Sequence, residues 1–594
     1  MTDISLNCKS EYVIARDGVR LAVSTWLPQG NGVGGNKYTA IVTTTRYWRA
    51  TALSEDKLEF QKCYPFASYL ISRGYALVVA DARGSGASFG CRETEISPEE
   101  VDDIGEVVAW IARKNWCDGR VATEGTSYTA NTALYSLLAA PPALKGVVCR
   151  APDFDPYRHL LAPGGIINDW FIEAWGAATC AQDCNDIEAL FSGGYYPAPE
   201  FGADKVTGVR PVDEDNNGSR LASAIAEHCN NFCIARQIDN FIFVDSKPLG
   251  SHQFLFEPKC REKFEKSRIP VVIRCGWHDA ATALGALCMF ATFSCPLRVI
   301  LGPWNHSGDS RVDPFCQADG VDSESINIET LFAKTVQFFD AIFGEYGPDH
   351  KEIDDQFWCV DYYTLGENRW KTTKQWPLKN TQTRRLYLAP DNQLSVNAPL
   401  LKEGSDQYHV SSISSTGLDN RWHAQAVNKP ILFPDRREAD KLLLVYDTQP
   451  LKENTEITGH PVVHLYIRSN AIDGQFFVYL ETIDPDGRVH MLTEGQLRGL
   501  HRSISNDTPP YKMFGPYHSL KSKDALPLVP GEVAEIAFDL FPISVLLKKG
   551  QRIRLAVAGC DADVFKPIPG CETPEISVER NRIYSSCIDL PIIN

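Results

Sequence analysis

Hydrophobic positions follow two different periods along the first 150 residues. Continuous apolar runs typical of buried strands occur at 39–45, 75–81, 120–125 and 144–152. Between them, segments at about 56–73, 98–113 and 128–139 show the apolar period of amphipathic helices. Alternation of strands and helices predicts a mostly parallel sheet that is covered by helices on both faces.

The helix from Pro98 carries the clearest start signal. Ser97 can cap its N-terminus, Pro98 suits its first turn, and Glu100 completes a capping box. Its apolar face then consists of Val101, Ile104, Val108 and Ile111.

The alternating pattern stops at residue 153 and resumes with strands at 270–277 and 297–304 and a helix that ends near 336–344. The segment 153–265 lacks the alternation. We expect it to be an insertion, helical in part, above the carboxyl edge of the sheet, where open α/β folds bind their ligands.

From about residue 380 the hydrophobic period changes to two. The segments 535–541 and 552–559 alternate, and 475–492 indicates a hairpin that turns at Pro485-Asp486-Gly487. Many short strands predict a β-sandwich of jelly-roll type. We therefore divide the chain into a first core part (1–152), a cap (153–265), a second core part (266–350) and a β-sandwich domain (351–594).

Composition narrows the class of protein. A chain of 594 residues is too long for one hydrophobic core, and a net charge of -16 argues against nucleic acid or anionic lipid as a partner.

Residues 1–5 show no secretory pattern, and the uncharged run 280–297 contains a proline and leads into a strand, so we interpret it as a buried helix. Of the 18 cysteines, most are expected to be reduced thiols in a cytoplasmic protein.

Two serines compete for the role of nucleophile. Ser88 lies in "GASFG", which fits the strict G-x-S-x-G pattern, but its strand ends at Asp81 and the next helix starts only near Pro98. Ser127 lies in "EGTSYTAN", a looser match, directly between a strand and a helix. A nucleophile elbow requires that placement, so Ser127 is the candidate, although Thr129 stands where a glycine is usual. The alternative is that Ser127 only caps the helix.

Two further residues follow strand ends in the order that an α/β-hydrolase triad requires. Asp279 follows the strand 270–277, and His306 follows the strand 297–304. The order Ser, Asp, His predicts that His306 is the general base and that Asp279 orients it. His278 adjoins Asp279 and is expected to be a hydrogen-bonded structural residue.

With these sites in place, the chain resembles the cocaine esterase and X-prolyl dipeptidyl-peptidase-like serine hydrolases from about residue 12 to its end. The matching segments are "DARGSGASFG", "GTSYTA", "GWHDAATALG", "GPWNHS", "FFDAIFG", "RLYLAPDNQLS", "DGRVHMLTEGQLRGLHR" and "LKKGQRIRLAVAG". The resemblance implies an α/β-hydrolase core with a helical cap and a C-terminal jelly roll, and hydrolysis through an acyl-enzyme. It also implies an oxyanion hole made by the hydroxyl of Tyr47, in "TTRYWRA", and the backbone N–H of Tyr128.

Other features are less specific. Six aromatic residues lie in segments near the predicted site: Trp48, Trp170, Phe171, Trp175, Trp277 and Trp304. If two of them line the site, they favour a substrate with a bulky apolar or aromatic acyl group. Cysteines 180 and 184, and 229 and 233, have i,i+4 spacing that could suggest zinc, but free thiols on helix faces are the simpler interpretation.

The sequence therefore predicts a serine hydrolase that acts on an ester or amide bond of a small molecule or short peptide and needs no metal or other cofactor. The same triad could serve an acyltransferase with an alcohol or amine acceptor, and a binding protein on an inactive hydrolase fold is a third possibility. The sequence is compatible with a homodimer and does not identify the substrate.

Overall fold

The computed structural model describes residues 8–28, 37–54, 65–193, 203–246, 257–315, 328–344, 357–426 and 431–593. The first half of the predicted helix 56–73 lies outside these residues, and its second half is helix α2 (Pro65–Ser72).

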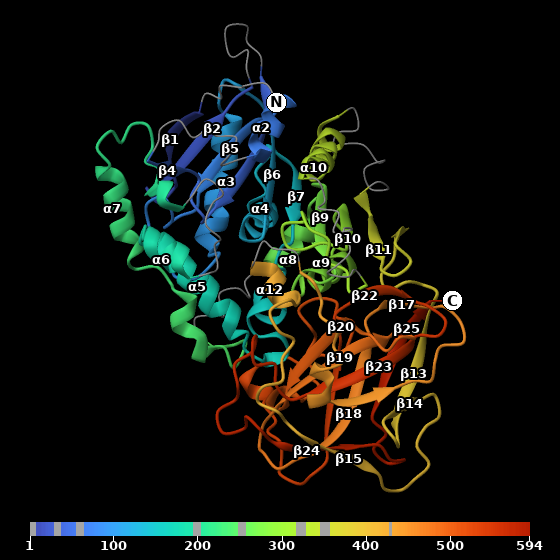
Figure 1. Ribbon diagram of the computed structural model, residues 1–594. Coiled ribbons are helices and arrows are strands. Elements are labelled where there is room, and N and C mark those ends of the chain that lie inside the picture. The colour runs from blue at the N-terminus through green and yellow to red at the C-terminus, as the bar shows by residue number, and fades with distance from the viewer. Residues whose placement is uncertain are drawn as a thin grey trace.

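The predicted α/β core is present as one open, ten-stranded sheet (Figure 1). Its strand order is β1-β2-β5-β3-β6-β7-β9-β10-β11-β12, and all neighbours from β5 to β11 run parallel. The strands are β1 (Cys8–Ile14), β2 (Arg20–Trp26), β3 (Tyr38–Thr45), β5 (Ala76–Asp81), β6 (Cys117–Thr126), β7 (Leu144–Arg150), β9 (Val271–Gly276), β10 (Leu297–Gly302), β11 (Cys359–Thr364) and β12 (Arg369–Thr373).

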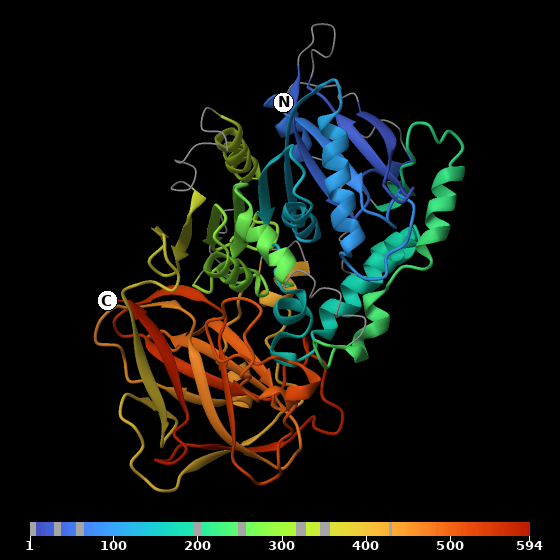
Figure 2. The ribbon, with the colours of Figure 1, turned by 180° about the vertical axis from the view of Figure 1, so that it is seen from behind.

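Helices cover both faces because neighbouring residues of each strand point to opposite sides. Val42 and Val147 face one cluster, together with α3 (Pro98–Ala112), α4 (Tyr128–Ala139) and α9 (Thr282–Thr292). Ile41 and Val148 face the other, with α2 and α10 (Ile328–Phe343). Viewed from behind, α3 lies in front of the sheet (Figure 2). The predicted capping box of α3 is confirmed: Glu100 N donates to Ser97 Oγ, and Ser97 N donates to the Glu100 carboxylate.

The uncharged run 280–297 forms the eleven-residue helix α9 and the turn into β10. α9 is buried against β9 and β10, which explains its apolar composition. Among the described residues, every helix is too short or too polar to cross a bilayer.

The segment between β7 and β9 is mainly helical and lies beside the sheet (Figures 1 and 2). It contains η1 (Tyr157–Leu161), η2 (Pro163–Gly165), α5 (Asp169–Asp183), α6 (Ile187–Ser192), η3 (Ala203–Lys205), β8 (Val206–Val209), α7 (Ser219–His228), η4 (Ile234–Asn240) and α8 (Pro258–Lys266). The short strand β8 pairs with β4 (Thr51–Leu53), which ties this cap to the loop after β3.

The C-terminal part is a β-rich domain, as the change of period predicts. The core extends beyond the predicted boundary at residue 350, because β11 and β12 belong to its sheet. The strands of the C-terminal domain are β13 (Thr381–Ala389), β14 (Gln393–Ser395), β15 (Ser405–His409), β16 (Leu444–Asp447), β17 (Thr455–Gly459), β18 (Val462–Ser469), β19 (Gln475–Ile483), β20 (Val489–Arg498), β21 (Ala534–Asp539), β22 (Ile543–Leu547), β23 (Arg552–Ala558), β24 (Glu575–Glu579) and β25 (Cys587–Ile593). The predicted hairpin is β19–β20, and Gly487 adopts the positive φ that its turn requires.

The C-terminal domain packs directly on the core. Short helix α12 (Arg421–Ala426) contacts α5 of the cap. Buried Arg421 donates to Ala280 O at 3.0 Å, and Ala280 N donates back to Arg421 O at 3.0 Å. Because Ala280 follows Asp279, this domain holds the loop that carries a predicted catalytic residue.

Candidate active site

The predicted site residues follow the carboxyl ends of neighbouring parallel strands. Tyr47 follows β3, Ser127 follows β6, Asp279 follows β9 and His306 follows β10. The carboxyl ends of parallel strands meet at one edge of a sheet, where α/β folds bind ligands. The fold therefore brings these four residues to the same edge.

Ser127 occupies a strained turn between β6 and α4. Its φ and ψ are 62° and -128°, a combination that a non-glycine residue rarely adopts. Its side chain makes no capping hydrogen bond to the helix. The interpretation of Ser127 as a simple helix cap is therefore wrong, and the backbone has the geometry of a nucleophile elbow.

Thr129 replaces the usual glycine without disturbing the elbow. Its hydroxyl accepts from Thr126 N at 2.7 Å and donates to Thr126 O at 2.8 Å. The space comes from Gly125, where a Cβ would lie 2.2 Å from the Thr129 carbonyl. The crowding expected at Thr129 is thus relieved two residues before the serine.

Ser88 is fully buried in the core. Its hydroxyl accepts from Ala22 N at 2.8 Å and donates to Asp81 O at 2.8 Å. These bonds fasten the glycine-rich loop after β5, so the strict G-x-S-x-G match marks a structural serine.

Asp279 and His306 are directly hydrogen-bonded. His306 Nδ1 lies 2.9 Å from Asp279 Oδ1 and 3.0 Å from Oδ2, and Asp279 is fully buried. Burial opposes the charged imidazolium, but the charge and hydrogen bond of Asp279 outweigh it and raise the pKa of His306 above its ordinary value. His306 Nε2 is buried and has no hydrogen-bond partner within the described part of the chain. The neighbouring His278 instead bonds Leu492 O at 2.8 Å, and burial lowers its pKa to about 3.

The hydroxyl of Tyr47 is positioned by the cap. Trp175 Nε1, on α5, donates to Tyr47 Oη at 3.0 Å, and the rings of Tyr47 and Tyr128 pack edge to face at 5.9 Å. Burial raises the pKa of Tyr47 to about 12, so it is a neutral hydroxyl at physiological pH. Tyr128 is the first residue of α4, where backbone N–H groups have no partner within the helix.

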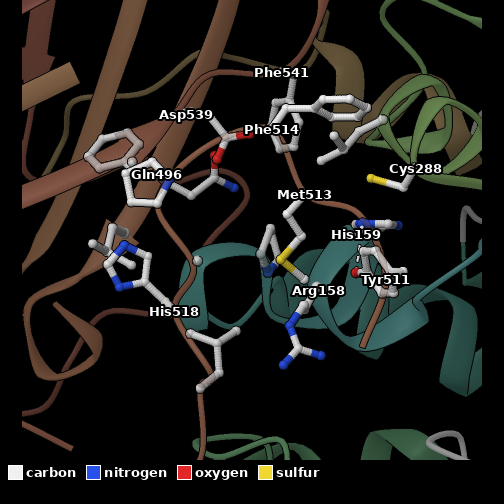
Figure 3. Close-up of a pocket in the computed structure, with 18 residues that line it drawn as sticks. Arg158, His159, Cys288, Gln496, Tyr511, Met513, Phe514, His518, Asp539 and Phe541 are labelled. Carbon is white, nitrogen blue, oxygen red and sulfur yellow. Dashed lines mark hydrogen bonds between the residues drawn. The ribbon is translucent and has the colours of Figure 1, made fainter. Parts of the chain in front are cut away.

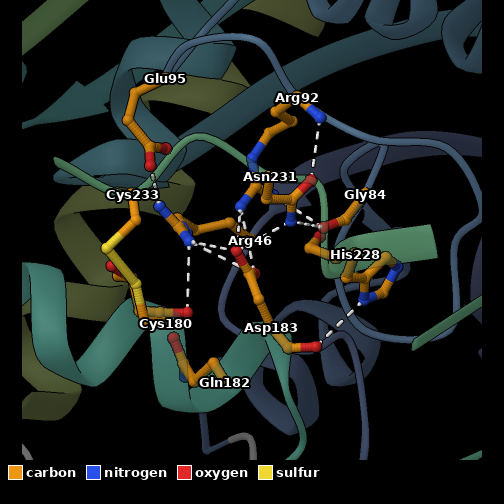
Figure 4. A network of polar contacts seen from close by, with 12 residues as sticks. Arg46, Gly84, Arg92, Glu95, Cys180, Gln182, Asp183, His228, Asn231 and Cys233 are labelled. Carbon is orange, nitrogen blue, oxygen red and sulfur yellow. Dashed lines mark hydrogen bonds and ion pairs between the residues drawn. A yellow bond between two sulfur atoms is a disulfide. The ribbon is translucent and has the colours of Figure 1, made fainter. Parts of the chain in front are cut away.

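A buried ionic network holds the loop that carries Tyr47 (Figure 4). Arg46 pairs with Glu95 and with Asp183, and Asp183 also pairs with Arg92 at 2.8 Å. Asn231 donates to Asp183 at 2.8 Å. Since Asp183 ends α5, the same contacts connect the loop after β3 to the helix that carries Trp175.

A disulfide adds a covalent connection in this region. Cys180 on α5 is bonded to Cys233, which directly precedes η4 (Figure 4). The prediction of free thiols is therefore wrong for these two residues, because the fold pairs each with a cysteine 53 positions away. Cys184 and Cys229 are free and exposed. Within the described ranges, no group of three or more His, Cys, Asp or Glu side chains is arranged to hold a metal ion.

The serine opens into a small cavity of about 50 Å³ beneath the cap. Its lining combines core and cap residues: Tyr47, Glu95, Ile96, Ser127, Tyr128, Asn131, Asp153, Pro156, Leu160, Leu161, Phe171, Trp175 and Ile234. Of the predicted aromatic residues, only Phe171 and Trp175 are in this lining, and their rings stack at 5.8 Å.

The other predicted aromatic residues pack elsewhere. Trp48 is buried and donates to Gln182 O, and Trp277 is buried in the core and donates to Tyr363 O. The Trp170 ring packs at a tilt of 42° against His423 of the C-terminal domain, and Arg274 lies over the Trp304 ring. Contrary to the prediction, Trp48, Trp170 and Trp277 do not line the cavity beside Ser127.

Asp153 is a site residue that the sequence reasoning did not single out. It follows β7, lines the cavity with Ser127 and accepts a hydrogen bond from Gln425 at 3.0 Å. Burial raises its pKa to about 6, although the nearby His306 opposes the shift. Its position directly after β7, at the carboxyl edge of the sheet, is the feature that could have identified it from the sequence.

Comparisons with known proteins cover nearly the whole chain. Residues 17–308 match the X-Pro dipeptidyl-peptidases of the S15 family, and residues 359–586 match the C-terminal non-catalytic domain of X-Pro dipeptidyl-peptidases. The chain is 37% identical to a Mycobacterium bovis protein named "Putative serine esterase Mb1866c", over 98% of this chain and 95% of that one. It is 24% identical to the cocaine esterase of a Rhodococcus strain, over 94% and 92% of the two chains. Its fold is similar to that of an α-amino acid ester hydrolase, with a TM-score of 0.70 at 18% identity over 100% and 98% of the two chains.

Proposed function

This chain belongs to the X-Pro dipeptidyl-peptidase (S15) family of serine hydrolases, and on that basis we propose that it hydrolyses small esters with a short apolar acyl group through an acyl-enzyme at Ser127. The observation that carries the proposal is the strained turn at Ser127 beside a cavity that the cap encloses. Amide substrates pass through the same intermediate and are a slower alternative.

In this mechanism Ser127 attacks the ester carbonyl while His306 Nε2 takes its proton. Asp279, bonded to Nδ1 at 2.9 Å, fixes the tautomer and stabilises the imidazolium. His306 then returns the proton to the leaving alcohol. A water molecule activated by His306 releases the acid in the second half of the reaction.

The oxyanion is stabilised by the Tyr128 N–H and the Tyr47 hydroxyl. The Tyr47 oxygen accepts from Trp175, and a hydroxyl that accepts from one group can donate its proton to another. Both donors belong to fixed elements, one to the start of α4 and one to a loop held by buried ion pairs. Donors fixed in this way favour the transition state because they need no reorganisation.

The size of the cavity limits the acyl group. A cavity of about 150 Å³ holds a benzene ring, whereas the space beside Ser127 is about 50 Å³. Two stacked aromatic side chains, Phe171 and Trp175, fill room that a bulky acyl group would need. This reverses the expectation of a bulky or aromatic acyl group and favours acetyl to butyryl esters.

Labelling tests the nucleophile. A fluorophosphonate probe should modify Ser127, and Ser127→Ala should lose turnover on the order of 10⁶-fold. Ser88→Ala is the matched control and should keep the label at Ser127. Mass spectrometry that places the adduct on Ser88, or on no residue, contradicts the proposal.

A series of 4-nitrophenyl esters tests the acyl group. We expect kcat/KM to fall from acetate and butyrate to benzoate and phenylacetate. Phe171→Ala should recover activity on the aromatic esters selectively, since it enlarges the cavity. If benzoate is the best substrate of the unmodified enzyme, the cavity argument is wrong.

A further inference from the structure

A second cavity lies where the cap, the core and the C-terminal domain meet (Figure 3). Its volume is about 110 Å³, larger than the cavity beside Ser127. Its walls come from η1 and η2 of the cap, from α9 of the core, from β20 and β21, and from residues 511–520. No residue of the predicted triad or oxyanion hole lines it.

Asp539, at the end of β21, contributes an acidic group with no cationic partner. Within the described residues, its carboxylate forms no ion pair and accepts no hydrogen bond from another side chain; its own backbone N–H interacts with it. Burial raises its pKa to about 6, so it is ionised at neutral pH. A carboxylate at a cavity wall without a counter-charge is a group that a cationic ligand would stabilise.

Gln496, on β20, adds an unused hydrogen-bond donor. Its side chain is 6% exposed, lines the same wall as Asp539 and has an Nε2 atom with no acceptor in the described structure (Figure 3). Buried amide groups nearly always have a partner. This unpartnered donor is independent of Asp539 and indicates a ligand that carries an acceptor oxygen.

Most other polar groups of the cavity have partners, although Arg158 Nε has none within the described residues. Arg158 forms an ion pair with Asp155 at 3.0 Å and donates to Ser519 O at 2.7 Å. The ring nitrogens of His518 lie 3.0 Å and 2.7 Å from the carbonyl oxygens of Ser503 and Ala537. The remaining wall is mostly apolar, with Leu284, Met513, Phe514, Phe538 and Phe541 among its residues. Asp539 is thus the charged side chain of the described lining that has no counter-charge.

We propose that this junction cavity binds a small amino alcohol, whose ammonium group pairs with Asp539, whose oxygen accepts from Gln496, and whose apolar part lies against Phe514 and Phe541. Aromatic faces and a carboxylate together form a favourable environment for an organic ammonium group. A cavity of about 150 Å³ holds the six heavy atoms of benzene, so a cavity of about 110 Å³ suits a ligand of roughly four heavy atoms.

Binding here would also act on the catalytic cavity. Helix η1 separates the two spaces: Arg158 and His159 line the junction cavity, whereas Leu160 and Leu161 line the cavity of Ser127. A ligand that orders one side of η1 therefore changes the wall on the other side. The binding itself does not depend on the proposed hydrolysis.

Calorimetric titration with 2-aminoethanol, which has four heavy atoms, tests the site at pH 7.5. Two matched ligands separate the contacts: ethylene glycol lacks the ammonium group, and propylamine carries a methyl group in place of the hydroxyl. We expect ethylene glycol to bind at least tenfold more weakly than 2-aminoethanol, and Asp539→Asn to weaken binding of 2-aminoethanol at least tenfold. Glu532→Gln, an exposed acid in the same domain, is the control and should leave the affinity unchanged.

Gln496→Leu provides a second variant. It should remove the preference for 2-aminoethanol over propylamine and leave the need for the ammonium group. Affinity should fall as the pH drops through about 6, because Asp539 then becomes protonated. Burial lowers the pKa of His159 to about 4 and lowers that of His518, so each histidine gains its charge below the pH at which a free imidazole does, and that charge would weaken binding of a cation further. Burial raises the pKa of the Cys288 thiol well above its ordinary value, so the thiol stays neutral. Arg158 stays charged, and Tyr511 stays neutral.

The titration is repeated on Ser127→Ala protein and on protein labelled at Ser127, if labelling succeeds, so that binding beside the serine is recognised by its loss in the labelled form. Equal binding of 2-aminoethanol and ethylene glycol, unchanged binding by Asp539→Asn, or a crystal structure with 2-aminoethanol only beside Ser127 would overturn the proposal. These readouts need no turnover, so a failure of the hydrolase mechanism would not be mistaken for a failure of this site.

Discussion

Replacing Tyr47 by phenylalanine tests the oxyanion hole most directly. The change removes one hydroxyl and should leave the ring in place, because the ring packs edge to face against Tyr128. Loss of one of two oxyanion donors typically costs about 10²–10³-fold in kcat, equivalent to roughly 2.7–4 kcal/mol. KM should change little, since the bond is stronger to the transition state than to the bound ester.

A second substitution, Trp175→Phe, tests whether Trp175 acts through the Tyr47 hydroxyl. It removes the 3.0 Å hydrogen bond that orients this hydroxyl. One neutral hydrogen bond contributes about 1 kcal/mol, so kcat should fall roughly fivefold. In the Tyr47→Phe background there is no hydroxyl to orient, and Trp175→Phe should then have almost no effect on kcat. Trp170→Phe is the matched control, because Trp170 packs against His423 and does not line the cavity.

Steady-state hydrolysis of 4-nitrophenyl acetate by the four members of this cycle, and by the control, gives kcat and KM separately. Circular dichroism and melting curves show whether each variant is folded. If Tyr47→Phe turns over at nearly the wild-type rate, Tyr47 is a packing residue. If Trp175→Phe lowers kcat equally in both backgrounds, Trp175 shapes the cavity and does not act through Tyr47.

Three further outcomes are expected. Asp279 raises the pKa of His306, and the general base must be neutral, so kcat/KM should decline as the pH falls through that raised pKa. Asp279→Asn should move this decline to lower pH. An unchanged pH profile would show that Asp279 does not act on the pKa of the general base. The disulfide between Cys180 and Cys233 closes a loop across a sequence separation of 53, and the loss of loop entropy in the unfolded chain corresponds to about 4 kcal/mol of stabilisation. Dithiothreitol should therefore increase hydrogen exchange in the cap of the wild-type enzyme. It should have no such effect on a Cys180→Ser, Cys233→Ser double variant. A chain that ends near residue 375 keeps β11 and β12 of the core sheet and should still be insoluble or unlabelled by fluorophosphonate; a soluble, monomeric and active fragment would show that the C-terminal domain is independent.

Strand and helix periodicity was sufficient to locate the candidate catalytic residues. The strands before Ser127, Asp279 and His306 end within a few residues of the predicted positions. In a parallel sheet the ends of the strands decide which side chains reach the common edge. For Ser127 the placement between β6 and α4 was more informative than the motif, since the strict match at Ser88 lies in a loop whose serine hydroxyl bonds the backbone.

Periodicity could not decide which cap side chains face the cavity. Trp48 and Trp175 are equally suitable from the sequence, yet only Trp175 lines the space beside Ser127. The direction of each ring depends on contacts between segments far apart in the chain, such as Trp48 with Gln182. The pairing of Cys180 with Cys233 has the same origin, because the i,i+4 spacing drew attention to the wrong partners.

The ion pairs around Arg46 have a positioning role that packing alone would not provide. Buried ion pairs often stabilise a fold no better than apolar residues of the same volume, because both charges lose their hydration. Arg46 nevertheless bonds Glu95 and Asp183 in a buried site, and Asp183 ends the helix on which Trp175 lies. These directional bonds fix the loop that carries Tyr47 relative to α5. They therefore hold both ends of the bond between Trp175 and Tyr47, the contact that positions the hydroxyl of the proposed oxyanion donor.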